Sequence, residues 1–517
     1  MRNVKLVVVM VLAMAAGVGA VVQQEPVDGA ANAKIRDEGL NRSKVAEPFD
    51  MFVNTIGPRL TASPSHKRAA EWARGTLAQW GMSNVHLEPW AFGRGWELEK
   101  LTVEMVEPRY MPLTGFAEAW TPSTPGEIVV SAVSTAGKTP EELTSMAAQI
   151  KGAAVLANGV ISAFIDKDRD QPELVPGARI GAPAAPREPS ASSGQGGGAN
   201  AARAGGAGGG AAGGGRAAGA GTGRGAAATP SPTATAAVLI KPSRGLHGTV
   251  FVQAGRETPA ATQPAIVLAA EHYNIVARLI AQGVAVKLRV NVKTKFYEAD
   301  RNSYNVIADI PGVDPVLKNE VVIVGAHLDS WHTSTGATDN ADGAAGVMEA
   351  FRILKASGLQ PKRTLRLALW SGEEEGLFGS KAFVTDHLTG DAKAADRDKV
   401  SAYFNIDPGT GPIYGWYAEN SPAAKAIFDA WMAPFKDLGF RQNILPGITN
   451  TDHLSFKAVG VPGFNPIQDY TNYDVRLHHT QVDTAEYVKI DDLKQTAVIL
   501  ASVAYHAAQR AERLPRQ

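Results

Sequence analysis

The sequence predicts an α/β domain built on a buried sheet, joined to a smaller α+β module. Three short apolar runs, residues 320–326, 364–370 and 401–406, are typical of strands that are buried on both faces of such a sheet. Before residue 295, strand-like and helix-like segments alternate in a separate stretch of chain. A chain of 517 residues is long enough for both parts to have hydrophobic cores.

The first 20 residues have the pattern of a secretion signal. Arg2 and Lys5 precede an apolar run at 6–20 that is too short to span a bilayer comfortably. We therefore expect residues 1–20 to be a signal peptide, and the mature protein to be secreted or periplasmic with no stable membrane anchor. An uncleaved anchor or a buried first helix is the alternative for this segment.

Residues 21–104 are predicted to form an N-terminal segment that packs on the main domain, because apolar residues recur at helical spacing over 65–80. The smaller module is predicted to span 105–290, and the main domain 295–510. The module is expected to contain helices at 140–148 and 270–281 and strands at 127–131, 152–157, 250–253, 264–268 and 285–292.

A stretch rich in Gly, Ala, Ser and Pro interrupts the module at about 183–236. It has no large side chains that would pack into a core, so it is predicted to be a disordered loop. A tether to a polyanion through Arg203, Arg216 and Arg224 is the alternative interpretation.

The composition excludes several classes of function. Lys plus Arg (51) equals Asp plus Glu (51), so the chain lacks the basic excess typical of nucleic-acid binding, and no nucleic-acid partner is expected. The chain has no cysteine, which excludes disulfides, thiolate nucleophiles and cysteine-based metal sites. A metal site would have to consist of His, Asp and Glu. The composition leaves the oligomeric state open.

Side chains that bind metals follow each of the three predicted strands of the main domain. His327 and Asp329 follow the first strand, Glu373 and Glu374 the second, and Asp407 the third. Ligands bind at this end of the strands in open α/β sheets, because the loops there meet at one edge. Two further segments add Asp339, in a Gly-rich turn before a helix that Asp342 or a neighbour caps, and the late pair His478 and His479.

This set of side chains suits zinc. Imidazole nitrogens and carboxylate oxygens are its ligands when thiolates are absent. Five ligands are too many for one tetrahedral ion, but they fit two ions if one carboxylate bridges them. The set consists of His327, Asp339, Glu374, Asp407 and one histidine of the C-terminal pair. Glu373, next to a ligand, is then free to act as a general base.

Five motifs in order resemble the zinc aminopeptidase and glutamate carboxypeptidase family of co-catalytic di-zinc exopeptidases. They are Gly325-Ala-His-Leu-Asp329, Gly336-Ala-Thr-Asp-Asn340, Ser371-Gly-Glu-Glu-Glu-Gly376, Asn405-Ile-Asp407 and His479-Thr-Gln-Val-Asp-Thr484. The residues of these motifs are most similar to those of the carboxypeptidase Q branch of the family. The resemblance implies a three-layer α/β/α peptidase domain with a mixed, mostly parallel sheet, and it identifies the smaller module as a protease-associated-like insertion.

The resemblance also implies roles for single residues. His327 and Asp407 become ligands of one zinc ion, and Glu374 and His479 of the other, with Asp339 as the bridge. Asp329 becomes the carboxylate that orients the His327 ring, and Glu373 the general base. His453 and His478 are candidates for a substrate or supporting role, and His479 is preferred to His478 as the ligand because it directly precedes Thr480.

The predicted function is hydrolysis of small peptides by an exported zinc exopeptidase of the aminopeptidase or dipeptidase type. A metal-bound hydroxide would attack the peptide carbonyl after Glu373 has taken its proton. Carboxypeptidase action would need a basic group for the substrate carboxylate, which Arg476 or Lys457 would have to supply. The alternatives are glutaminyl-cyclase-like acyl chemistry on the same scaffold and a noncatalytic, receptor-like relative.

Overall fold

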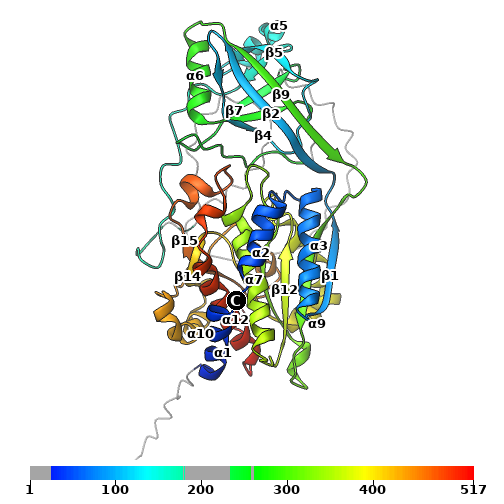
Figure 1. Cartoon of the computed structure of the whole chain (residues 1–517), viewed down its shortest axis with the longest axis vertical. Helices are drawn as coiled ribbons and strands as arrows, with labels where there is room; N and C mark the ends of the chain where they lie inside the picture. Colours follow the sequence, from blue (N-terminus) through cyan, green and yellow to red (C-terminus); the bar gives the residue numbers. More distant parts are fainter. Residues whose placement is uncertain (1–24, 179, 181–232, 258–260, 517) are drawn as a thin grey trace, which may run out of the picture.

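The computed structural model describes residues 25–178, 180, 233–257 and 261–516. Figure 1 shows two bodies, each built around its own sheet: the main domain below and the inserted module above. The signal peptide predicted at 1–20 and most of the loop predicted at 183–236 lie outside the described residues. Among the helices that are described, none is both long and apolar enough to cross a membrane.

The main domain contains a seven-stranded mixed sheet, as the sequence predicts. Strands β1, β12, β11, β13 and β15 run in one direction, and β10 and β14 run in the other. In spatial order the strands are β1 (Ser83–Ala91), β10 (Asn302–Ile310), β12 (Thr364–Trp370), β11 (Val321–His327), β13 (Val400–Asn405), β15 (Gly463–Asp469) and β14 (Thr410–Tyr417).

The three predicted central strands are adjacent and end together. The last pairs in their registers join His327 to Trp370 and Gly325 to Asn405. The loops that follow β11, β12 and β13 therefore start at one edge of the sheet, as expected for parallel strands.

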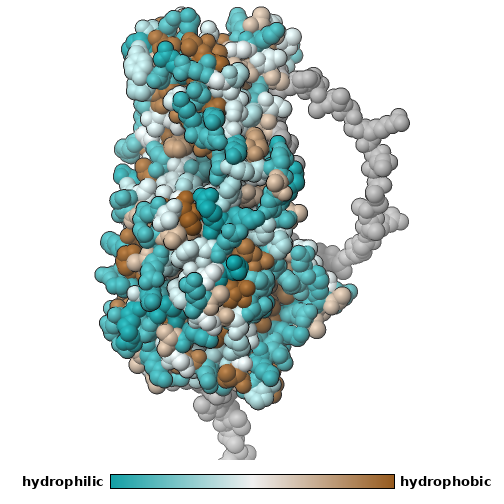
Figure 2. Space-filling model, turned by 45° about the vertical axis from the view of Figure 1, so that its right-hand side comes forward, coloured by the Kyte–Doolittle hydropathy of each residue, from teal (hydrophilic) through white to brown (hydrophobic). Residues whose placement is uncertain are grey.

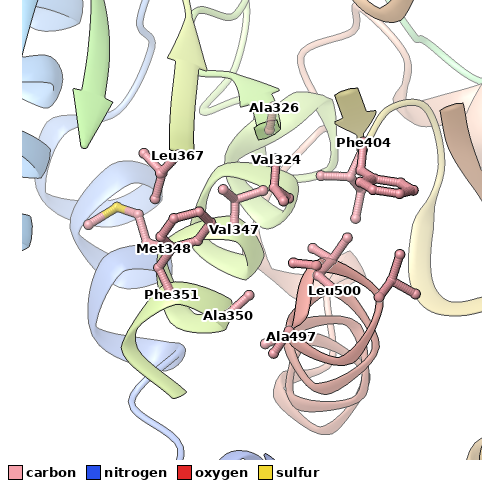
Figure 3. Close-up of a cluster of buried hydrophobic side chains, with 14 of the residues drawn as sticks. Val324, Ala326, Val347, Met348, Ala350, Phe351, Leu367, Phe404, Ala497 and Leu500 are labelled. Carbon is pink, nitrogen blue, oxygen red and sulfur yellow. The ribbon is translucent and has the colours of Figure 1, made fainter. Parts of the chain in front are cut away.

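Helices cover both faces of this sheet, which confirms the three layers. One face packs on α7 (Asp342–Ala356), α12 (Ile490–Gln509), α1 (Gly29–Asn41) and α3 (Pro64–Gln79), and the other on α8 (Phe378–His387) and α11 (His453–Lys457). Smaller helices are α2 (Ala46–Asp50), α9 (Ala394–Lys399) and α10 (Pro422–Met432). In Figure 3, Val347 and Phe351 of α7 and Leu500 of α12 face Val324 and Phe404 of the sheet.

The sequence of α3 shows why such helices form where they do. Ser63 accepts a hydrogen bond from the His66 N–H, and Pro64 occupies the first turn, so the N-terminus is capped. The apolar residues recur at helical spacing, and Ala69, Ala73 and others of that stripe are buried against the sheet. On the face in Figure 2, apolar side chains form only small groups among hydrophilic ones.

The inserted module is built on an eight-stranded sheet. In spatial order its strands are β3 (Met111–Pro112), β2 (Gly95–Glu107), β9 (Lys287–Tyr297), β5 (Ile128–Ser134), β6 (Ala154–Leu156), β7 (Val238–Pro242), β8 (Ala265–Leu268) and β4 (Gly115–Ala117). Its helices are α4 (Pro140–Ser145), α5 (Ala147–Ile150) and α6 (Ala270–Ala281).

The structure corrects three predicted boundaries. The limits at 105 and 290 fall inside β2 and β9, which pair along most of their lengths, so the module spans 95–297. Residues 95–104 thus belong to the module and not to the N-terminal segment. After the module, the main domain resumes at β10 and not at the predicted residue 295. Before the module, β1 already forms the edge strand of the main sheet.

One predicted strand of the module does not form. Residues 250–253 run without regular structure because their N–H groups bind elsewhere: Val250 N–H to the Gln481 side chain (2.7 Å), Phe251 N–H to Ser243 Oγ (2.9 Å), and Val252 N–H to the His479 carbonyl (3.0 Å). This segment therefore lies against the main domain. The helix predicted at 270–281 is α6, and the one predicted at 140–148 is divided into α4 and α5.

The module is joined to the main sheet at one point and contacts the main domain at one further place. Ala91 of β1 pairs with Asn302 of β10, so the chain leaves the main sheet and returns to it at adjacent points. Elsewhere, Arg169 of the module forms an ion pair with Asp474 at 2.6 Å, and both side chains are buried (4% and 2% exposed). Arg169 also lies over the ring of Tyr470, at 4.9 Å.

We expect the substitution Arg169→Met to lower the free energy of unfolding by about 3–5 kcal/mol at pH 7, because it leaves a buried carboxylate uncompensated. Burial raises the pKa of Asp474, but its hydrogen bonds to Arg169 lower it further, so the pKa lies below the ordinary 3.8. A depressed pKa stabilises the fold above pH 3.8, and the effect is lost as the pH falls through the folded-state pKa. Denaturant titrations at pH 7 and pH 3 would measure the difference.

The matched control is Lys425→Met, which breaks an exposed ion pair with Asp429. Exposed pairs contribute about 0–1 kcal/mol, so this variant should unfold close to the parent protein. Equal losses in the two variants would contradict the role of the buried pair.

Candidate metal centre

The structure brings all five predicted metal ligands together at the edge of the main sheet. His327 ends β11, Asp339 lies in the short turn η3 (Ala337–Ala341) before α7, and Asp407 follows β13. Glu374 follows β12, and His479 follows the turn η6 (Tyr473–Leu477). All five side chains are buried.

Asp339 lies between the two histidines. Its Oδ1 is 3.1 Å from His327 Nε2, and its Oδ2 is 3.2 Å from His479 Nε2. Each histidine has a second carboxylate nearby: Asp407 Oδ1 lies 3.9 Å from His327 Nε2, and Glu374 Oε2 lies 2.9 Å from His479 Nε2. The residues therefore form two His-carboxylate groups that share one carboxylate, which is the arrangement that two bridged ions require.

His478 lies next to this cluster but farther from its centre. Its Nε2 is 3.8 Å from Asp339 Oδ2, and its ring lies on the rings of His479 (3.7 Å between centroids) and Tyr473 (5.2 Å). The shorter distances from His479 to both Asp339 and Glu374 favour His479 as the ligand.

The electrostatics of the cluster favour a bound cation. Burial, together with neighbouring carboxylates such as Asp339, raises the pKa of Asp407 well above its ordinary range, and burial raises the pKa of Glu373 in the same way. Burial lowers the pKa of His327, but contacts with Asp329 and Asp339 more than offset this. Buried like charges at this density are compensated by metal ions in proteins.

The chemistry of the donors fits zinc. His327 Nε2 and Glu374 Oε1 are buried and have no hydrogen-bond partner among the described residues. Buried polar atoms are rarely left without partners, so these two atoms have the character of ligand atoms. A set of imidazole and carboxylate donors without thiolates suits a borderline ion such as zinc.

Asp329 supports the cluster in a way that differs from the prediction. The His327 Nδ1–H donates to the backbone carbonyl of Asp329 at 2.9 Å, whereas the Asp329 carboxylate lies 3.7 Å away. That carboxylate instead accepts hydrogen bonds from the N–H groups of Glu373 and Glu374, both at 3.3 Å, and from Thr61 Oγ1 at 3.1 Å. Asp329 therefore orients the ring through its main chain and the glutamate loop through its side chain.

Asp483, which the sequence placed in a motif but gave no role, positions Asp339. Its carboxylate accepts from the Thr338 N–H (2.7 Å), the Thr338 hydroxyl (2.8 Å) and the Asp339 N–H (3.1 Å). On the other side of the turn, Asn340 Nδ2 donates to the Ile406 carbonyl at 2.8 Å. The turn that carries Asp339 is therefore held from both sides.

His453 lies outside the cluster. Its Nδ1 is 2.5 Å from Thr451 Oγ1, and its Nε2 is 3.3 Å from Glu419, a carboxylate that also pairs with Lys457. These contacts are those of a structural histidine. Neither Lys457 nor Arg476 borders the cavity described next, so neither is placed to bind a substrate carboxylate there.

A cavity of about 940 Å³ opens onto the cluster. Its floor includes Asp339, Glu373 and Asp407, and residues of α8 and α11 form one wall. Another part of the wall comes from the inserted module, a contribution that no sequence motif signalled. Its residues are Ile165, Arg169, Arg244, Phe251, Gln253 and Arg256.

The chain is similar to known peptidases. Residues 305–504 match the sequence profile of peptidase family M28. Carboxypeptidase Q of Mus musculus is 26% identical over 482 residues, covering 92% of this chain and 88% of that protein.

Two solved structures share the fold. The peptidase M28 precursor of Shewanella amazonensis has a TM-score of 0.66 at 22% identity, covering 94% of this chain and 98% of the other. The zinc aminopeptidase BSAP of Bacillus subtilis has a TM-score of 0.56 at 15% identity, covering 91% and 97%. Residues 305–504 therefore form a peptidase family M28 domain, and the protein is a metallopeptidase.

Proposed function

We propose that the protein is a di-zinc exopeptidase that cleaves short peptides with a free α-amino group, with Glu373 as its general base. The observation that carries this proposal is the position of Asp339, whose two oxygens each lie within 3.2 Å of a different histidine. Glu373 borders the same cavity.

Each protein ligand has a place in this proposal. His327, Asp407 and one oxygen of Asp339 would hold one ion, and Glu374, His479 and the other oxygen would hold the second. Zinc ions in such a site supply Lewis acidity, which makes water more acidic and a peptide carbonyl more electrophilic.

Glu373 would move the proton. Its carboxylate borders the cavity, and its N–H is fixed by Asp329, so the side chain is presented beside the ligand Glu374. The carboxylate takes the proton of the attacking water and returns it to the nitrogen of the leaving group. Burial raises its pKa, which makes it a stronger base than an exposed glutamate.

Two features favour a free amine and a short substrate. Carboxylates on the cavity floor, such as Glu373 and Asp339, can pair with the ammonium group of a peptide N-terminus. Residues of the module line the same cavity as residues of α8 and α11, so a chain that extends far on both sides of the cleaved bond would meet the module. The export predicted from residues 1–20 is part of the same proposal.

The test compares leucyl-alanine, its N-acetyl form and its C-terminal amide as substrates of the purified protein. We expect cleavage of the free dipeptide, at least about 100-fold loss on acetylation, complete loss with a chelator and recovery with zinc. Equal cleavage of the acetylated peptide would contradict the amine requirement. Absence of any cleavage with two zinc ions bound would favour cyclase-like chemistry or a noncatalytic relative.

A further inference from the structure

One cation on the cavity wall, Arg244, has no polar partner for its guanidinium among the residues that the structure describes. Arg169 pairs with Asp474, Lys381 Nζ donates to the Gly376 carbonyl at 2.7 Å, and Arg256 Nη1 donates to the Gly255 carbonyl at 2.7 Å. The guanidinium of Arg244 makes neither an ion pair nor a hydrogen bond within the part of the chain that the structure describes.

Arg244 is nevertheless half-buried and fixed in position. Its guanidinium carbon lies 4.2 Å from the centre of the Phe251 ring, a cation–π contact that leaves the N–H groups free. Its carbonyl accepts from the Ile165 N–H at 2.9 Å. Burial lowers the pKa of Arg244, and no carboxylate offsets this loss of hydration. A charge held in this way is costly unless something completes the pair.

The position of Arg244 relative to the metal cluster is set by Phe251. The Phe251 ring lies 5.5 Å from the His479 ring, so the guanidinium carbon is within about 10 Å of that ring's centre. Val252 holds this segment in place, because its N–H donates to the His479 carbonyl at 3.0 Å. An extended residue spans about 3.3–3.6 Å. An upper bound of about 10 Å corresponds to no more than about three extended residues, so a short peptide whose cleaved bond lies at the metals can reach Arg244.

We infer that Arg244 is the site on the inserted module that binds a substrate carboxylate, which for a dipeptide is the C-terminal carboxylate. The inference rests on the proposed peptidase function and makes it more specific. The planar guanidinium matches a carboxylate with two parallel hydrogen bonds.

The test measures kcat/KM for leucyl-alanine, leucyl-alanine amide and the α-amide of leucyl-aspartate in the zinc-loaded parent protein and in Arg244→Met. We expect the variant to lose about 10- to 100-fold on leucyl-alanine and less than about threefold on its amide. Arg244→Lys should recover part of the loss, since lysine restores the positive charge but not the two parallel N–H donors of a guanidinium. Lys287→Met, which removes an exposed cation of the module, is the matched control and should match the parent.

The outcomes separate the inference from the proposed function. If the parent protein cleaves none of the peptides, the proposed function fails, and the inference fails with it. If the parent is active and Arg244→Met retains the preference for the free carboxylate, or loses both substrates equally, only the inference is overturned. If the variant loses activity mainly on the aspartate α-amide, the carboxylate that Arg244 binds is that of a side chain.

Discussion

Replacing Glu373 by glutamine should lower kcat for dipeptide cleavage by about 10²- to 10⁴-fold while the protein keeps two zinc ions. Glutamine has the shape of glutamate but cannot accept the proton of the attacking water. The proposed ligand set is unchanged, because Glu373 borders the cavity next to Glu374 and is not one of the five proposed ligands. Steady-state kinetics together with zinc analysis would measure both quantities.

The matched control is Glu375→Gln, two positions further along the same loop. Burial, followed by the nearby Asp329 carboxylate, raises the pKa of Glu375 to about 8, so this side chain is mostly neutral at pH 7 and glutamine replaces it with little change in charge. We expect this variant to stay within about tenfold of the parent. Full activity of Glu373→Gln with both ions bound would refute its role as the base.

The second large effect is expected at Asp339. Asp339→Asn should reduce the zinc content from two ions to less than one per chain, and activity by at least about 100-fold. Loss of a partner outside the ligand sphere already costs about 10- to 100-fold in metal affinity or activity, and a shared ligand should cost more. An amide has only one acceptor oxygen, so it cannot serve both histidine groups. Zinc analysis after dialysis, with kinetics at added zinc, would measure the change.

Asp342→Asn is the control for this substitution. Burial raises the pKa of Asp342 well above the ordinary value, which favours the uncharged carboxyl group that an amide resembles. Its Oδ1 accepts from the Gly343 N–H at 2.6 Å, a bond that asparagine can also make. We expect two zinc ions in this variant. Two tightly bound ions in Asp339→Asn would show that Asp339 does not bridge them.

The sequence predicted the central strands well because they depend on a local pattern, and the five ligands predicted from it lie together in the structure. β12 matches the predicted 364–370, and β11 and β13 match within one residue, because a strand buried on both faces is a continuous apolar run. Their ligands could be found because parallel strands end at one edge.

The cavity wall could not be predicted, because it depends on contacts between distant parts of the chain. Phe251 lies in a segment with the apolar pattern of a strand, yet its neighbours bind Gln481 and His479. The hydrogen bond from His327 to the Asp329 carbonyl could not be predicted either, because a sequence pattern identifies side chains and gives no position for a backbone oxygen.

The pairing of Ala91 with Asn302 has a consequence for how the chain can be altered. These two residues face each other across neighbouring antiparallel strands, and residues 92–301, which include the whole module, lie between them. A tight two-residue turn can join two such strands into an ordinary hairpin. Deleting the module would therefore leave the sheet edge and the five metal ligands unchanged in sequence. The module's part of the cavity wall and the five predicted metal ligands are thus encoded in separate stretches of the gene, so each can change by mutation while the other is kept.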